Sequence, residues 1–185
     1  MILPVAVFGS PVLKEVASDI DKNYPNLQEV ISDMFETMYK ADGIGLAAPQ
    51  VGLSIRLFVI DASPLHEDHP ELANFKKVFI NAQILETLGD EIWENEGCLS
   101  LPGIREDVLR PTGIKIKYLD ENFVEHTEIF EGFGARVIQH EYDHIEGKVF
   151  TDRLSMLKKR LLKGKLTSIS KGIADVTYRI KTGVK

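Results

Sequence analysis

The sequence predicts an α+β fold, with mainly antiparallel sheets around a central helix that carries an H-E-x-x-H motif at residues 140–144. Segments with the alternating pattern of half-buried strands follow one another through short polar turns, which favours antiparallel pairing. The helical segments do not alternate with strands in the regular β-α-β order of a parallel sheet. Residues 1–185 are long enough to bury a sizeable core and are expected to form one domain.

The first element that the sequence predicts is a long helix. Pro25 can occupy its first turn, and the helix is expected to end near Ala41, before a glycine-rich segment. Residues 55–61 predict a buried strand, and residues 62–74 predict a polar loop. The apolar residues that recur at helical spacing are Leu27, Val30, Ile31, Met34, Phe35 and Met38.

Strands are predicted through the middle of the chain. Residues 78–86 and 91–93 have strand composition, and a turn is expected between them at residues 89–90. Residues 114–118 alternate lysine with apolar side chains, as a half-buried strand does. A polar turn then leads into a returning strand over residues 124–130.

A further helix and a short strand are expected after the motif helix. Ser155 can cap the helix, and Gly164 or Gly172 is expected to interrupt it. Alternation over residues 175–181 then predicts a short C-terminal strand.

Charge is distributed unevenly along the chain. Residues 148–185 carry 11 Lys and Arg against two acids, a net charge of +9, whereas residues 1–147 carry a net charge of -15. The basic C-terminal helix and tail, from about residue 154 to residue 185, can therefore meet nucleic acid or another polyanion. The alternative is a solvated face of a helix that packs on the body.

Composition excludes several classes of protein. No apolar run approaches the roughly 20 residues that a membrane helix needs. The first residues lack the basic start and the apolar stretch of a secretory signal. The single cysteine cannot form an internal disulfide, which fits a reducing compartment. The sequence thus predicts a cytoplasmic protein without a membrane partner.

The H-E-x-x-H motif predicts a metal site. His140 and His144 are four residues apart and therefore lie on one face of a helix, where both imidazoles can bind one metal ion. Glu141 lies beside them, where a carboxylate can exchange a proton with water at the metal.

A third ligand is needed to complete the site. In one known pattern the third ligand is a histidine ten residues after the first, but Phe150 occupies that position here. In another, a glutamate downstream of the helix is the third ligand, but no glutamate follows Glu146. Cys98 could complete a set of three protein ligands with a fourth position open, which is the layout of a catalytic site. The alternative is that this lone cysteine is a small buried hydrophobe.

Residues 43–52 form a glycine-rich segment whose small residues let the backbone approach a ligand closely. Gln50 in this segment offers an amide donor that could polarise a carbonyl oxygen. An ordinary glycine-rich loop is the alternative.

Together, three segments resemble the peptide deformylase family, which carries G-x-G-x-A-A-x-Q, E-G-C-x-S and H-E-x-x-H in that order. All three motifs are intact at residues 43–50, 96–100 and 140–144. The resemblance runs from about residue 3 to about residue 165. It implies a hydrolase that removes the formyl group from the N-terminal formylmethionine of newly made polypeptides.

The resemblance implies a role for each motif residue. Cys98, His140 and His144 are expected to bind one divalent metal, Fe²⁺ by family association, although Zn²⁺, Ni²⁺ or Co²⁺ also suit thiolate and imidazole ligands. Glu141 is expected to carry the proton. Gln50 and the backbone N–H of Leu99 are the expected donors to the oxyanion.

The same analogy indicates a substrate pocket and partners. The enzyme is expected to bind formylmethionyl nascent peptides and no DNA. The charge of the basic C-terminal segment, rather than the analogy, indicates a contact with the ribosome. Strand addition beside residues 43–45 is a plausible way to hold the peptide. Arg136 receives no role. The residues expected to contact the substrate are Gly43, Ile44, Gly45, Glu96, Gly97, Arg105, Phe133 and Val137.

Two rival functions stay open on the sequence. A metallopeptidase would also carry H-E-x-x-H, although the missing third-ligand glutamate and Phe150 argue against it. A non-catalytic module stabilised by a metal would need neither Glu141 nor an open coordination position.

Overall fold

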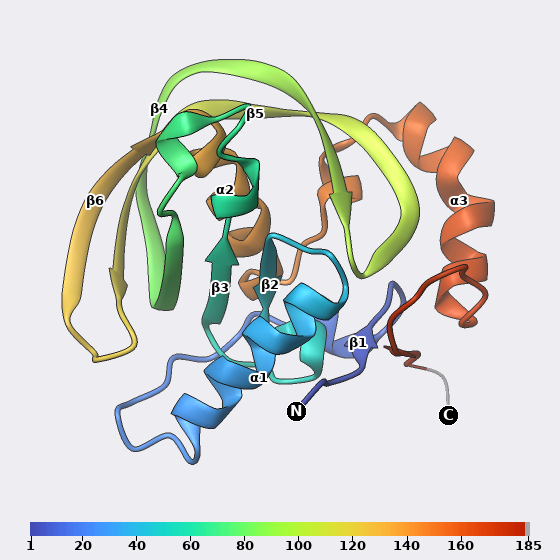
Figure 1. Cartoon of the computed structure of the whole chain (residues 1–185). Helices are drawn as coiled ribbons and strands as arrows, with labels where there is room; N and C mark the ends of the chain where they lie inside the picture. Colours follow the sequence, from blue (N-terminus) through green and yellow to red (C-terminus); the bar gives the residue numbers. More distant parts are fainter. Residues whose placement is uncertain (184–185) are drawn as a thin grey trace.

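The computed structural model describes residues 1–183; Lys185, which contributes to the basic tail, lies outside them. Helix α2 lies in the middle, beneath the long curved strands β4 and β5, whereas α1 and α3 lie on the outside (Figure 1). The helices are α1 (Leu27–Lys40), α2 (Gly132–Ile145) and α3 (Met156–Ser170), with 3-10 helices at Pro11–Lys14, Ala48–Val51, Ser63–Leu65, Pro70–Leu72 and Phe150–Arg153. The strands are β1 (Val5–Ala6), β2 (Gly45–Ala47), β3 (Leu57–Asp61), β4 (Lys76–Cys98), β5 (Leu101–Leu119), β6 (Glu125–Glu131) and β7 (Ile180–Lys181).

The main sheet has five strands in the order β2-β3-β4-β5-β6, and every neighbouring pair is antiparallel. A separate pair, β1 with β7, is parallel. The predicted α+β class with mainly antiparallel sheets is confirmed. The predicted strands over residues 55–61, 114–118 and 124–130 correspond to β3, to the end of β5 and to β6.

The prediction of two strands with a turn at residues 89–90 is wrong, because β4 runs unbroken through this point. β5 pairs with both halves of β4, and the register shifts where the turn was expected. Gly89 has a φ of 73°, and a β-carbon there would collide with the Thr112 hydroxyl. The glycine therefore makes a bulge that bends the long strand instead of reversing it.

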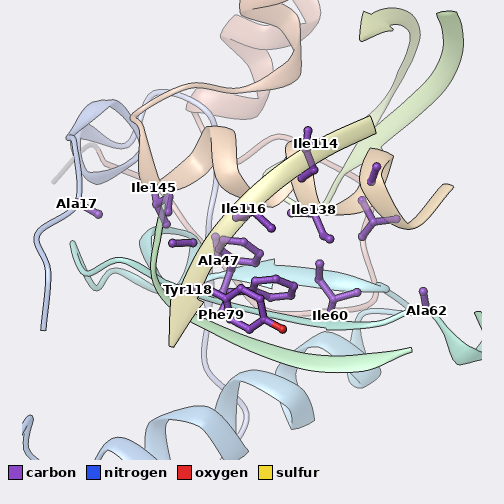
Figure 2. Close-up of a cluster of buried hydrophobic side chains, with 14 of the residues drawn as sticks. Ala17, Ala47, Ile60, Ala62, Phe79, Ile114, Ile116, Tyr118, Ile138 and Ile145 are labelled. Atoms are coloured by element: carbon purple, nitrogen blue, oxygen red, sulfur yellow. The ribbon is translucent and has the colours of Figure 1, made fainter. Parts of the chain in front are cut away.

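The main core lies between α2 and the sheet. Ile138 and Ile145, two turns apart on α2, pack with aromatic and β-branched residues of the strands. Figure 2 shows them with Phe79 of β4 and with Ile116 and Tyr118 of β5. This packing fixes the helix that carries the H-E-x-x-H motif against a rigid support.

The outer helices largely follow the sequence pattern. α1 buries its apolar stripe, and Met34 and Met38 are fully enclosed. α3 begins after Ser155, whose side chain accepts a hydrogen bond from the Lys158 N–H, and it continues through Gly164 to end before Gly172. Within residues 1–183, no helix combines the length and apolarity that a membrane crossing requires.

The C-terminal strand is shorter than the alternation over residues 175–181 predicts. Only Ile180 and Lys181 pair, with Val5 and Ala6 of β1. The residues before them belong to no strand, and the alternation reflects the half-burial of Val176 and Tyr178 against the body of the protein.

Candidate metal centre and active site

Two elements bring the candidate ligands together. α2 presents His140 and His144 on one face, and the end of β4 brings Cys98 against them. One ligand atom from each of the three residues lies within 4.8 Å of the other two. They form the only such group of His, Cys, Asp and Glu in the described part of the chain.

Cys98 lies in an electropositive environment. Its Sγ is 3.4 Å from His144 Nε2 and 3.5 Å from the Gln50 side-chain nitrogen. Burial alone would raise the pKa of the Cys98 thiol, but the charges and hydrogen bonds of His144 and His140 outweigh burial and lower this pKa to about 5. The sulfur is therefore held as a thiolate near neutral pH, which is the form that binds metals.

Gln50 is buried and fixed at both ends of its amide. Its Oε1 accepts a hydrogen bond from the Ala47 N–H at 2.9 Å, and its Nε2 donates to Ser100 Oγ at 3.1 Å. The glycine-rich segment is thus an ordered part of the site rather than a free loop. Within it, residues 45–47 form β2, an edge strand of the main sheet.

Glu141 is 4% exposed, and its Oε2 has no hydrogen-bond partner among the described residues. A β-carbon at Gly45 would lie 2.5 Å from Glu141 Oε1, so only glycine leaves room for this carboxylate. Burial raises the pKa of Glu141 to about 7, despite the opposing charges of His140 and His144. A carboxyl group with this pKa can both take and return a proton near neutral pH.

A buried carboxylate orients the first histidine. His140 Nδ1 donates a hydrogen bond of 2.8 Å to Glu96 Oε1, which leaves Nε2 directed to the cluster. Arg110 donates two hydrogen bonds to Glu96, of 2.7 and 2.9 Å, and Arg136 donates one of 2.8 Å. Burial raises the pKa of Glu96, but the hydrogen bonds and charges of His140 and Arg110 outweigh it and hold the pKa well below its usual value.

The same network continues to the second turn of the motif. Arg110, which is fully buried, also donates to Asp143 at 2.9 Å, and Arg153 contacts both oxygens of Asp143 at 2.7 Å. Asp143 lies beside His144 in the sequence, so the network ties the motif helix to β5 and to the 3-10 helix after it. No role was predicted for Arg110, Asp143 or Arg153, because their partners lie far away in the sequence or on another element.

A cavity of about 800 Å³ opens beside the cluster. All eight residues predicted to contact substrate line it, together with Gln50, Cys98, Leu99, His140 and Glu141. Arg136, which had no predicted role, lines it as well. The unforeseen lining comes from Asp42 after α1, from Leu65, from Asn95 of β4, from the start of β5 and from residues 175–178.

The donor set fits a divalent metal. A thiolate and two imidazoles, held on rigid elements with an oriented first histidine, suit zinc, ferrous iron, nickel or cobalt. The unpartnered Oε2 of Glu141 beside these donors fits a site in which a further polar group completes the arrangement. Three protein ligands beside an open cavity can support hydrolysis of a carbonyl compound.

Sequence comparison places the chain among known proteins. A family model described as Polypeptide deformylase matches residues 2–160. A relative from Christiangramia forsetii, named Peptide deformylase, is 55% identical and aligns over 98% of this chain and 96% of its own length. Another of that name, from Cytophaga hutchinsonii, is 55% identical over the full length of both chains.

Solved structures are similar as well. A peptide deformylase from Legionella pneumophila has a TM-score of 0.80 and 36% identity, and the match covers 92% of this chain and 96% of that one. The peptide deformylase from Thermus thermophilus has a TM-score of 0.82 and 34% identity over 93% and 99% of the two chains.

Proposed function

The chain belongs to the peptide deformylase family, enzymes that hydrolyse the formyl group from the N-terminus of new polypeptides, and we propose how its residues perform this reaction. The observation that carries the proposal is the meeting of Cys98, His140 and His144 with Glu141 in one cavity. A hydrolytic metal site needs these two parts together, whereas a structural metal site needs no buried carboxyl group beside an open position.

Cys98, His140 and His144 hold the metal. Once bound, a divalent ion supplies Lewis-acid chemistry, which makes water a better nucleophile near neutral pH and polarises the formyl carbonyl. Fe²⁺ is the native ion in this proposal, by family association, and Zn²⁺, Ni²⁺ or Co²⁺ can replace it. Glu96 accepts a hydrogen bond from His140 Nδ1, so the ring directs its Nε2 toward the metal ligands.

Glu141 carries the proton. Its unpartnered oxygen accepts a proton from the attacking water and later returns it to the leaving nitrogen, so that formate and a free amino terminus are released. The pKa of about 7 suits both halves of this exchange. Gly45 leaves the space in which the carboxyl group sits.

Gln50 and the backbone N–H of Leu99 stabilise the oxyanion that forms on the formyl oxygen. The fixed amide of Gln50 supports its part, because a preorganised donor loses little freedom when the oxyanion appears. Leu99 follows the metal ligand Cys98 directly, which keeps its N–H close to the reacting carbon.

The rest of the cavity selects the substrate. By family analogy, the pocket for the methionine side chain is bordered by Ile44, Glu96, Gly97, Phe133, Val137 and His140, all of which line the cavity. The peptide beyond it pairs with the backbone of residues 43–45 by strand addition, which tolerates any sequence. The edge position of β2 supports this mode, and Arg105 binds further along the peptide.

The basic helix α3 carries the enzyme to the ribosome in the cytoplasm. α3 holds five Lys and Arg and no acidic residue. Met156, Leu157 and Leu161 are exposed on the same helix, so a mixed basic and apolar surface faces outward. Ribosomal RNA is a dense polyanion that such a surface can meet.

The reaction is tested by comparing formyl-Met-Ala-Ser with acetyl-Met-Ala-Ser. The metal-loaded protein is expected to release formate from the first peptide, and a strong chelator is expected to abolish this release. The acetyl peptide, whose carbonyl carries a methyl group, is the matched control and should react far more slowly. Cleavage between Met and Ala, followed by mass spectrometry, would instead support a metallopeptidase.

A further inference from the structure

The chain after α3 returns to the body of the protein and is held there by backbone hydrogen bonds. The Val5 N–H donates to the Arg179 carbonyl at 2.9 Å, and the Val7 N–H donates to the Lys181 carbonyl at 3.1 Å. Together with the parallel β1–β7 pair, these bonds fix where the segment just before residue 180 can lie.

That preceding segment, residues 175–178, lines the substrate cavity. Val176 and Tyr178 are half-buried, whereas Asp175 and Thr177, which alternate with them, are exposed. The Tyr178 hydroxyl donates a hydrogen bond of 2.7 Å to the Leu99 carbonyl, across 79 positions of sequence. The family model ends at residue 160, so this wall of the cavity lies beyond the part of the chain that it matches.

The residues on either side of Leu99 also make contacts with other parts of the protein. Before Leu99, Cys98 contacts His144; after it, Ser100 receives the Gln50 amide on its hydroxyl and the Phe8 N–H on its carbonyl, at 2.9 Å. Leu99 lies in the turn between β4 and β5, outside both strands, so the regular hydrogen bonds of the sheet do not fix its carbonyl. Tyr178 supplies that restraint.

We propose that Tyr178 is a positioning residue of the deformylase, which fixes the Leu99 backbone so that its N–H stays aimed at the developing oxyanion. The inference rests on the proposed function, because it assigns a use to the Leu99 N–H. An oxyanion donor is effective only when its direction is set before the reaction. The Leu99 carbonyl belongs to the next peptide unit, so the hydrogen bond from Tyr178 holds the residue that carries the N–H in place and limits how far that N–H can move.

The hydroxyl is a dependable donor. Burial, assisted by the nearby Cys98, raises the pKa of Tyr178 to about 12. The proton therefore stays on the tyrosine near neutral pH.

Tyr178→Phe tests the proposal, because it keeps the ring and removes only the hydroxyl. The matched control is Tyr39→Phe, which removes a hydroxyl that donates to Asp61 at 2.6 Å, outside the cavity lining. Both variants are loaded with the same metal and assayed for formate release from formyl-Met-Ala-Ser. Metal stoichiometry and the thermal midpoint are measured for each.

The expected result separates kcat from KM. Tyr178→Phe should lower kcat and kcat/KM together, by about threefold to tenfold, which is the range of one lost hydrogen bond of ordinary strength. KM and metal content should stay within twofold of the wild type, because the restraint matters when the oxyanion forms rather than when the substrate binds. Tyr39→Phe should match the wild type in kcat.

Three results would overturn the inference: an unchanged kcat in Tyr178→Phe, a change confined to KM, or loss of metal. The last would mean that Tyr178 acts through Cys98. These failures differ from failure of the proposed function, which would appear as a wild-type enzyme that releases no formate.

Discussion

Replacing Arg110 with methionine should destabilise the protein and weaken its metal site. Arg110 has no exposed surface and donates three hydrogen bonds, two to Glu96 and one to Asp143. Methionine fills much of the same volume without a charge. The substitution therefore removes the shared partner of two carboxylates that are themselves 6% and 3% exposed.

The expected loss of stability depends on which partners Glu96 and Asp143 keep when Arg110 is replaced. Breaking a buried ion pair from one side costs about 3–5 kcal/mol, because a charge is left in the interior without its partner. Here Glu96 keeps Arg136, and Asp143 keeps Arg153, so the lower end of about 3 kcal/mol applies. In a chain of this length, 1 kcal/mol shifts the melting midpoint by about 2–4 °C, so a fall of about 6–12 °C is expected.

The metal site should respond separately. Glu96 orients His140, and losing such an orienting group typically costs about 10- to 100-fold in metal affinity. Arg110→Met leaves Glu96 in place but held by one arginine fewer, so zinc affinity should fall by less than this range. Thermal unfolding of the chelator-treated protein measures the first effect. Titration of zinc against a competing chelator measures the second.

Lys117→Met is the control on the same strand. Lys117 pairs with Glu125 at 3.1 Å, but both side chains are about half exposed. Such a pair contributes at most about 1 kcal/mol, so its loss should lower the midpoint by less than about 4 °C and leave zinc affinity unchanged. If Arg110→Met behaves like Lys117→Met in both measurements, the reasoning about the buried network is wrong.

Three further substitutions test the site and the basic helix. Cys98→Ser should strongly reduce metal content and turnover, because a hydroxyl is a poor ligand for soft metals; full metal content and full turnover would exclude the thiolate as ligand. Glu141→Ala should keep the metal and lose about 10²- to 10⁴-fold in kcat, whereas joint loss of metal would make the carboxylate a ligand. Charge reversal at Lys158, Lys159 and Lys163 should weaken ribosome pelleting at low salt without slowing deformylation of short peptides, and unchanged pelleting would remove the ribosome proposal.

The sequence predicted features that depend on local spacing. The histidines of the motif are four residues apart, and a helix brings them to one face wherever it lies in the fold. The apolar stripe of α1 works in the same way, and the structure buries Met34 and Met38 as expected. The prediction that Cys98 lies beside the histidines came from the resemblance of three ordered motifs to a known family. Local sequence patterns alone cannot show that the end of a strand meets a helix 42 positions away.

Features that depend on which elements pack or pair together in space could not be predicted from the local sequence. Gly89 and Asp90 carry an ordinary turn signal, and nothing local distinguishes a turn from a bulge. The difference lies in β5, which continues alongside β4 past this point and keeps the chain extended. The role of Arg110 was hidden for the same reason, because its two carboxylate partners come from another strand and from α2.

The C-terminal region divides into two parts that its overall charge conceals. Five of the eleven basic residues that motivate a ribosome contact lie on α3, and Lys158 already pairs with Glu106 of β5 at 3.0 Å, so part of that charge serves to dock the helix. The segment after α3 forms part of the cavity wall instead. Its alternation buries Val176 and Tyr178 against the cavity, and β1 holds its end. Charge reversals at Lys159 and Lys163, which leave the Lys158 pair intact, and Tyr178→Phe should therefore give independent results: the first should change salt-dependent binding alone, and the second should change kcat alone.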